Sequence, residues 1–131
     1  MDQQRRTYTL EQANDLIPQV RAILLQLAVE QRRLDTAHAD LHRQLDSNGD
    51  PSAAARADRE ESQVVRIREG MRSLLDHLAT LGVELRDLEM GLLDIPGERD
   101  GGPVWLCWRL SDPSVAFWHA TDEGFANRRP W

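Results

Sequence analysis

Apolar residues recur at alternating steps of four and three along the first part of the chain. The repeat begins after Pro18, which is a permitted first helical position, and its members are Val20, Leu24, Leu27, Leu34, Leu41 and Leu45, with Gln31 and His38 filling the two gaps. A seven-residue period of this kind is typical of a helix that packs along one seam. The pattern predicts a long helix over residues 18–46.

A second stretch has the same period. Its members are Ala57, Glu60, Val64, Ile67, Met71, Leu74, Leu78 and Leu81, and Gly82 follows where a left-handed residue would end a helix. This predicts a helix over residues 53–81, separated from the first by a turn at residues 47–51. Two long helices joined by so short a turn lie antiparallel, in a register that places His38 beside Glu60.

A short helix is predicted upstream of Pro18. Thr9 and Gln12 have the spacing of a capping box, so this helix should cover residues 10–16. Proline lacks an amide hydrogen and disfavours a helical residue before it, which predicts a kink or a break at Ile17.

After Gly82 the hydrophobic period changes to two. Four short strands are predicted, at residues 83–85, 91–95, 104–110 and 115–120, with breaks at Pro96-Gly97, at residues 101–103 and at residues 111–114, and with a tail at residues 125–131. All four Trp lie at or after Trp105, as half-buried strands require. The predicted fold class is α+β. It consists of a long antiparallel two-helix, coiled-coil-like hairpin (residues 1–81) with a small antiparallel sheet of three or four strands at its open end (residues 82–131), packed as one domain.

Composition excludes several classes of protein. The chain has 131 residues and a net charge of -6, which disfavours binding to nucleic-acid phosphates. Every basic residue is Arg, so lysine-based covalent catalysis is excluded, and the single Cys excludes an internal disulfide and a multi-cysteine zinc finger. Residues 1–10 have no apolar core of a secretion signal, and no apolar run approaches membrane-spanning length. We therefore expect a soluble, cytoplasmic, bacterial-type protein without a membrane partner.

Three reactive residues are candidates for a site in the predicted sheet. A carboxylate (Asp94), a thiol (Cys107) and an imidazole (His119) are ligand types that zinc or another divalent metal accepts, and Asp122 is a further possible ligand. The same residues could form a Cys–His pair with an acid that orients the imidazole. Each also has a purely structural explanation, as a buried thiol, a hydrogen-bonded histidine and a capping acid. A one-residue change in strand register decides whether Cys107 and His119 share a face.

Two further groups of polar residues are candidate binding sites. Arg128, with Trp108 and Trp118, could bind an anionic ligand or a nucleotide, and Arg129 could assist, although salt bridges to Asp94, Asp112 or Asp122 explain the arginines equally well. His38 and His42 have a metal-chelating spacing on the first long helix, but a polar layer opposite Glu60 that fixes helix register is the commoner arrangement.

A two-helix hairpin buries one seam and leaves the neighbouring apolar residues Ile23, Val65 and Leu75 uncovered. A second copy forming a four-helix bundle, or another protein partner, would cover them. The leading hypothesis is a structural or interaction protein, homodimeric through the hairpin, with a polar pocket in the sheet. The alternative is a metal-dependent or thiol enzyme that uses Asp94, Cys107 and His119, and nucleotide or nucleic-acid binding comes third.

Several C-terminal motifs resemble a known family. They are Arg86-Asp87-Leu88, Gly91-Leu92-Leu93-Asp94-Ile95-Pro96, Leu106-Cys107-Trp108, Trp118-His119, and Gly124-Phe125 with Arg128, together with Tyr8-Thr9-Leu10-Glu11-Gln12-Ala13 at the start. In this order they resemble the bacterial family termed domain of unknown function 2203. The resemblance implies recurring polar positions at Asp94, Cys107, Asp112, His119, Asp122 and Arg128. The chain departs from the family pattern at Ser111-Asp112, Ala120 and Asn127, and Ala120 removes one possible metal ligand.

Overall fold

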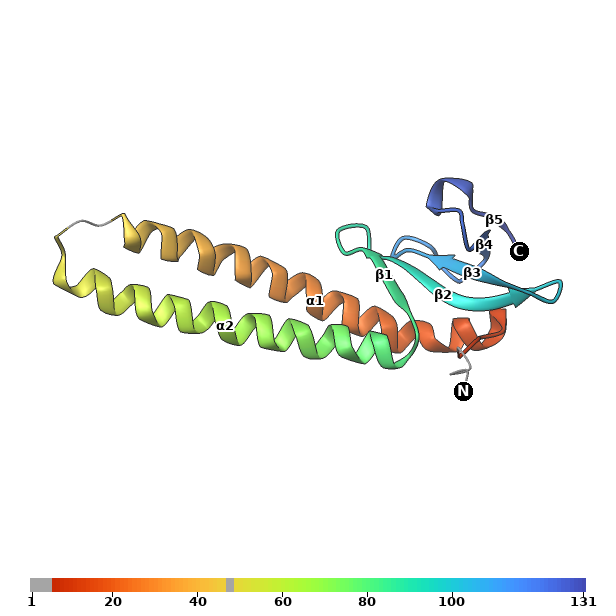
Figure 1. Ribbon diagram of the computed structural model, residues 1–131, viewed down its shortest axis with the longest axis horizontal. Coiled ribbons are helices and arrows are strands. Elements are labelled where there is room, and N and C mark those ends of the chain that lie inside the picture. Colours follow the sequence, from red (N-terminus) through yellow and green to blue (C-terminus); the bar gives the residue numbers. More distant parts are fainter. Residues whose placement is uncertain (1–5, 47–48) are drawn as a thin grey trace. The chain divides into compact units, whose positions relative to one another are not determined.

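The structure is a computed structural model that describes residues 6–46 and 49–131. Two helices, α1 (Leu10–Leu45) and α2 (Pro51–Thr80), precede an antiparallel sheet (Figure 1). Its strands are β1 (Glu84–Asp87), β2 (Leu92–Arg99), β3 (Gly102–Trp108), β4 (Phe117–Ala120) and β5 (Arg129–Pro130), and a short 3-10 helix lies at Phe125–Asn127. The α+β class and the helical hairpin are confirmed.

The chain divides into two compact units. One combines the residues up to Leu25 with Asp76–Trp131 and so holds the start of α1, the end of α2 and the whole sheet. The other, Gln26–Leu75, holds the remainder of both helices. The predicted boundary fell after residue 81 instead, and the packing of sheet and hairpin as one domain stays a prediction. Within residues 6–46 and 49–131, neither helix has an apolar stretch of the length that crossing a membrane requires.

The start of α1 follows from its first residues. Thr9 Oγ1 accepts the backbone N–H of Gln12 at 3.0 Å, and Gln12 Oε1 accepts that of Thr9 at 3.0 Å, which confirms the capping box. The predicted break at Ile17 is wrong, because α1 runs through Pro18 as one helix rather than as separate helices at 10–16 and 18–46. Pro18 costs a backbone hydrogen bond, but it lies on the exposed side of a helix whose opposite side is buried, and that packing outweighs the loss.

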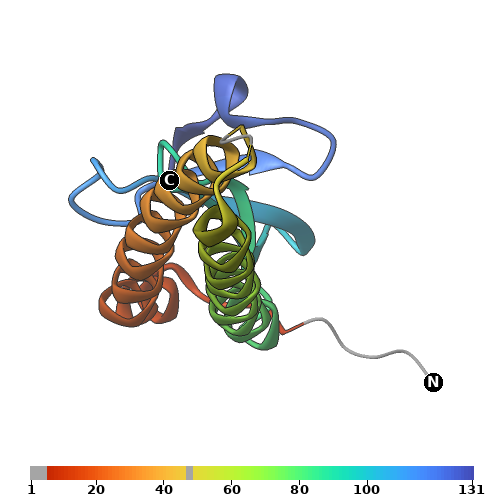
Figure 2. The same cartoon turned by 90° about the vertical axis from the view of Figure 1, so that its left-hand side faces the viewer.

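In the unit Gln26–Leu75, α1 and α2 run antiparallel and side by side (Figures 1 and 2). Their shared core consists of Leu34, Ala37, Val64 and Ile67, with Met71 packed against it. The seam predicted for α2 is confirmed, because its members from Ala57 to Leu78 are buried or half-buried. The heptad pattern therefore located the buried face of this helix correctly.

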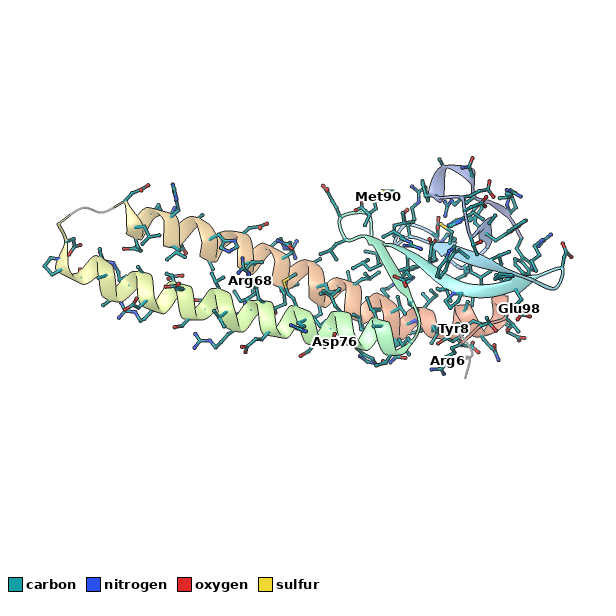
Figure 3. All side chains as sticks on the ribbon, viewed as in Figure 1. Arg6, Tyr8, Arg68, Asp76, Met90 and Glu98 are labelled. Carbon is teal, nitrogen blue, oxygen red and sulfur yellow. The ribbon has the colours of Figure 1, made fainter. Side chains whose placement is uncertain are left out.

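The seam predicted for α1 is wrong in its last repeats. Ala37 is buried where His38 was expected, and Leu45 is 66% exposed. His38 lies at the surface, and its Nε2 contacts the guanidinium of Arg68 (labelled in Figure 3) at 3.3 Å. Steps of three and of four both satisfy a heptad period. The small apolar Ala37 is buried at no polar cost, whereas an imidazole there would lose its hydration.

The boundaries of α2 differ slightly from the prediction. It begins at Pro51, where Asp50 Oδ1 accepts the N–H of Ser52 at 2.9 Å and so caps the first turn. The predicted turn at residues 47–51 includes Ser47 and Asn48, which lie outside the described residues. At the other end Gly82 has φ of +78°, which confirms the left-handed residue after the helix.

The sheet is a meander in which consecutive strands are neighbours, in the order β1-β2-β3-β4-β5. It has five strands rather than three or four, because the predicted tail contributes β5, whose Arg129 and Pro130 pair with Trp118 and Phe117 of β4. Proline is compatible with this position, since an edge strand leaves its missing N–H unused.

The predicted break at Pro96-Gly97 is also wrong, because both residues pair with β3 inside β2. A Cβ at residue 97 would come within 2.9 Å of Leu106 Cγ, so the glycine here makes room for the Leu106 side chain rather than forming a turn. The chain turns at Asp100-Gly101, whose φ angles of +53° and +80° are those of the two-residue hairpin turn that matches strand twist.

The two faces of the sheet have different characters. Leu93 pairs with Trp108 and Ile95 with Leu106, and these four buried residues line one face, where the guanidinium of Arg21 on α1 lies 5.6 Å from the Trp108 ring. Because side chains alternate along a strand, the residues between them point to the opposite face. That opposite face carries the reactive residues.

Candidate metal centre

Three side chains of types that bind zinc converge on this second face. Asp94 lies on β2, Cys107 on β3 and His119 on β4, and one ligand atom from each lies within 4.8 Å of the other two. The residues are only 4%, 0% and 1% exposed. Residues distant in the sequence therefore form one enclosed cluster across three adjacent strands.

The pairing of β3 with β4 brings the cluster together. Asp94 is the direct partner of Cys107, and Cys107 pairs with Phe117, two residues before His119. Cys107 and His119 therefore share a face and lie diagonally. The register therefore falls on the side of the open alternative in which the two residues share a face. Residues 109–116 form a longer connection than the predicted break at residues 111–114, because β3 ends at Trp108 and β4 begins at Phe117.

The connection between β3 and β4 is anchored by the start of α1. Asn14 Oδ1 accepts the N–H of Val115 at 2.8 Å, and Asn14 Nδ2 donates to the Val115 carbonyl at 3.1 Å. In the same connection, Trp108 Nε1 donates to the Asp112 carbonyl at 3.2 Å. In a tight turn these backbone groups would form hydrogen bonds with each other. Here Asn14 and Trp108 supply the partners, which allows the longer connection and fixes the register of β4.

Both ring nitrogens of His119 lie next to oxygen atoms. Nδ1 is 2.9 Å from the Ala120 carbonyl oxygen, and Nε2 is 2.9 Å from Asp94 Oδ1. A carbonyl oxygen can only accept, so Nδ1 carries a proton and Nε2 is the nitrogen directed at the cluster. The 2.9 Å contact places Asp94 Oδ1 directly beside this nitrogen.

Arg86 fixes the orientation of Asp94. Its Nε donates to Asp94 Oδ2 at 2.9 Å, which leaves Oδ1 directed at His119. The Arg86 guanidinium also lies 5.1 Å from the centre of the Trp105 ring, so an aromatic contact holds it in place.

Cys107 is a free, buried thiol. Burial raises its pKa from 9.0 to about 11, and the charge of Asp94 adds to the rise, while a hydrogen bond from Arg128 opposes it. A thiol with this pKa is neutral near pH 7, and a buried neutral thiol is a poor nucleophile. The environment therefore does not activate Cys107 for covalent catalysis.

Arg128 forms a buried ion pair beside the thiol. Its Nη1 and Nη2 donate to the two carboxylate oxygens of Asp112 at 2.7 and 3.2 Å. Its guanidinium lies 4.1 Å from the centre of the Phe117 ring and 4.6 Å from that of Phe125. Of the partners considered from the sequence, Asp112 is the one that binds Arg128.

The other predicted site residues lie apart from the cluster. Trp108 is fully buried on the opposite face, and Trp118 is half-buried between the guanidinium groups of Arg99 and Arg129, at 4.9 and 4.6 Å. Asp122 is exposed in the turn after β4. Arg129 pairs with Glu123, a partner that the sequence did not suggest. His42 pairs with Asp46 at 3.3 Å at the surface of α1.

The cluster can accept a divalent metal ion after small shifts of its side chains. Zinc bonds of about 2.0–2.3 Å in a tetrahedron separate ligand atoms by about 3.3–3.8 Å. The Nε2–Oδ1 distance of 2.9 Å would have to lengthen slightly, and Cys107 Sγ, within 4.8 Å of both, would move closer. These displacements are within the reach of side-chain rotation.

The whole described chain matches one family. The sequence profile of the family described as "Uncharacterized conserved protein (DUF2203)" covers residues 6–131. The chain belongs to this family. The resemblance of the C-terminal motifs is thereby confirmed, and Asp94, Cys107 and His119 all lie within the DUF2203 match. No curated protein and no solved structure matches the chain.

Arg86 is the cluster residue that sequence reasoning missed. It belongs to the first of the DUF2203 motifs quoted above, so a signal existed, but its partner did not follow from spacing. The pairing of β1 with β2 is irregular between Leu85 and Asp87, and Arg86 lies at this irregularity. A bulge re-aims the side chain that it contains. The direction of the Arg86 side chain therefore cannot be predicted from the regular alternation of residues along a strand.

Proposed function

We propose that the protein binds one zinc ion through Asp94, Cys107 and His119, and that the ion ties β2, β3 and β4 together. The observation that carries this proposal is the convergence of three different zinc-binding atoms within 4.8 Å on adjacent strands. One thiolate, one imidazole and one carboxylate match the preference of zinc for nitrogen and sulfur ligands with some oxygen.

The surroundings of the ligands support the proposal. Histidines that bind metals usually donate their other ring N–H to a carbonyl or carboxylate, and His119 Nδ1 does so to Ala120. Metal-binding carboxylates are themselves hydrogen-bonded, as Asp94 is to Arg86. The thiolate and carboxylate would neutralise the two charges of the ion, which lowers the cost of burying it.

A structural role fits better than a catalytic one. Three protein ligands leave a fourth position on zinc, which a catalytic site gives to water or substrate from an accessible pocket. The three ligand residues are almost fully buried, and the thiol is not activated. The enzyme that the sequence offered as an alternative therefore has less support than a non-catalytic protein with a metal-stabilised sheet.

Metal analysis tests the proposal. We expect protein purified without chelator and without a polyhistidine tag to contain one zinc per chain, measured by mass spectrometry of the metal. Cys107→Ala should lose it, because two remaining ligands bind zinc weakly. His77→Ala, which removes a histidine from the surface of α2, should keep it. Returning zinc to the metal-free protein at a hundredfold excess over Kd should stabilise it by about 2.7 kcal/mol.

Two outcomes would contradict this account. Metal-free wild type that is not stabilised by added zinc, cobalt or nickel would show that the cluster is a hydrogen-bonded network alone. Equal zinc content in wild type and Cys107→Ala would show that the metal binds elsewhere.

We also propose that the unit Gln26–Leu75 pairs with a second copy, as the leading hypothesis from the sequence holds. Val65 and Leu75 on α2 are 50% and 43% exposed, whereas Ile23 is covered. The charges of this unit are nearly balanced, with eight Arg and nine acidic residues, which favours self-association over an acidic or basic partner. A cytoplasmic location and a bacterial origin remain predictions.

Sedimentation equilibrium tests the dimer. We expect a dimeric mass at micromolar concentration for wild type and a monomeric mass for the double variant Val65→Asp/Leu75→Asp. Ser73→Asp, an exposed polar position on the same helix, should remain dimeric. Leu27→Asp is unsuitable, because Leu27 is fully buried and its loss would unfold the hairpin. A monomeric wild type would contradict the proposal.

A further inference from the structure

A metal ion can enter an enclosed site only if a neighbouring segment of the chain opens. The three ligand residues are at most 4% exposed, so no ion reaches them while every neighbouring segment stays in place. The strands β2 and β3 pair over seven residues each and carry the buried core of their unit, so they open last. The segment that opens first must lie beside the cluster and be weakly held.

Residues 125–131 form such a segment, here called the strap. It consists of the 3-10 helix Phe125–Asn127, Arg128, the two-residue strand β5 and Trp131. No residue of the 3-10 helix is buried, and β5 is exposed at both positions. The strap joins β4 by two strand pairs and by the N–H of Trp131, which donates to the Ala116 carbonyl at 2.8 Å.

Arg128 connects the strap to the cluster. Its side chain is 12% exposed, it binds both oxygens of Asp112, and its guanidinium lies 4.1 Å from the centre of the ring of Phe117, the strand partner of Cys107. Paired residues point to the same face of a sheet, so the guanidinium lies over the face that carries the thiol, next to Cys107. Breaking the contact with Asp112 would release the part of the strap that covers Cys107.

We propose that the strap is the gate of the metal site and that the ion pair between Arg128 and Asp112 is its latch. Opening the latch exposes Cys107 and gives metal ions a path in and out. The role in metal exchange rests on the proposed zinc function. The opening itself does not, because the accessibility of the thiol can be measured without metal.

Thiol labelling of metal-free protein tests the gate. Arg128→Gln removes the bidentate pair, and we expect Cys107 to react with a small aromatic disulfide at least tenfold faster than in wild type. Because this variant also lowers global stability, its matched control is Val104→Ala, which removes buried core from the other face of β3. The labelling rates of Arg128→Gln and Val104→Ala are compared after a stabilising osmolyte has been added to each, at a concentration that makes their unfolding free energies equal. Equal labelling rates at equal stability would overturn the proposal.

A second variant tests the gate without changing the ion pair between Arg128 and Asp112. Trp131→Ala removes a 41% exposed ring that lies 4.7 Å from the Arg99 guanidinium, so it loosens the end of the strap without touching the core. We expect faster labelling of Cys107, and Glu98→Gln, an exposed change on β2 (Figure 3), should label like wild type. Unchanged labelling in Trp131→Ala would contradict a gate formed by the strap.

Zinc release separates the two proposals. With the protein loaded with zinc, transfer of the metal to a coloured chelator should be at least tenfold faster from Arg128→Gln than from wild type. If wild type binds no zinc but the labelling rates differ as expected, the gate holds and the metal function fails. If zinc binds and leaves both proteins at the same rate, the gate fails and the metal function stands.

Discussion

His119→Ala is expected to destabilise the protein by about 3–5 kcal/mol and to abolish zinc binding. The substitution leaves Asp94 Oδ1 and the Ala120 carbonyl without the imidazole in a site that is almost fully buried. Each buried acceptor that loses its hydrogen-bond partner costs about 1–3 kcal/mol, and more when it is charged, although Arg86 still binds Asp94 Oδ2. Urea unfolding measures the loss, and metal analysis of the same preparation measures the binding.

The control for this change is a histidine outside the cluster. His77→Ala removes an exposed imidazole that contacts Gln19 at 2.9 Å, and it should alter the unfolding free energy by less than about 0.5 kcal/mol. If His119→Ala were as stable as His77→Ala, the imidazole could not be the buried link between β2 and β4 described above.

Asp112→Ala is expected to cost a similar amount, about 3–5 kcal/mol. Asp112 is 7% exposed, binds Arg128 through both oxygens and accepts the N–H of Arg109 at 3.1 Å. Its removal strands the guanidinium of Arg128 between two phenylalanine rings. Urea unfolding of Asp112→Ala and of the double variant with Arg128→Ala would show coupling, because the second change removes the stranded charge. Strictly additive losses would contradict the pairing.

The same carboxylate makes stability depend on pH. Burial alone would raise the pKa of Asp112, but the hydrogen bonds from Arg128 and from the Arg109 backbone outweigh it and lower the pKa below 3.8. A lowered pKa in the folded state stabilises the fold above the unfolded value of 3.8 and loses this contribution as the pH falls through the folded value. Asp112→Asn should therefore show a shallower loss of unfolding free energy on acidification than wild type.

The heptad period could be predicted from the sequence, but not every side chain on the seam. In α2 the seam from Ala57 to Leu78 is buried or half-buried, and the choice of Val64 over Val65 and of Leu74 over Leu75 is confirmed. In α1, Ala37 and His38 are adjacent and both fit the period, and a preference for the larger side chain chose the wrong one. Similarly, the sequence predicts breaks both at Pro96-Gly97 and at residues 101–103, because both segments favour turns, and only the second is near the actual turn at Asp100-Gly101.

The residues of the site could be identified from the sequence, but their proximity in the fold could not be predicted. Residue type alone selected Asp94, Cys107 and His119. Whether they share a face depends on the length of the connection between β3 and β4, which Asn14 on α1 fixes from about one hundred residues away through bonds to Val115. A contact of that kind leaves no local pattern. The bulge that directs Arg86 toward Asp94 also leaves no local pattern, so it could not be predicted from the sequence.

X-ray absorption at the zinc edge of the loaded protein tests the central claim most directly. The account predicts one sulfur at about 2.3 Å and nitrogen or oxygen neighbours at about 2.0–2.1 Å, with the sulfur absent in Cys107→Ala. A zinc spectrum with only nitrogen and oxygen neighbours in wild type would place the metal outside the cluster and contradict the account.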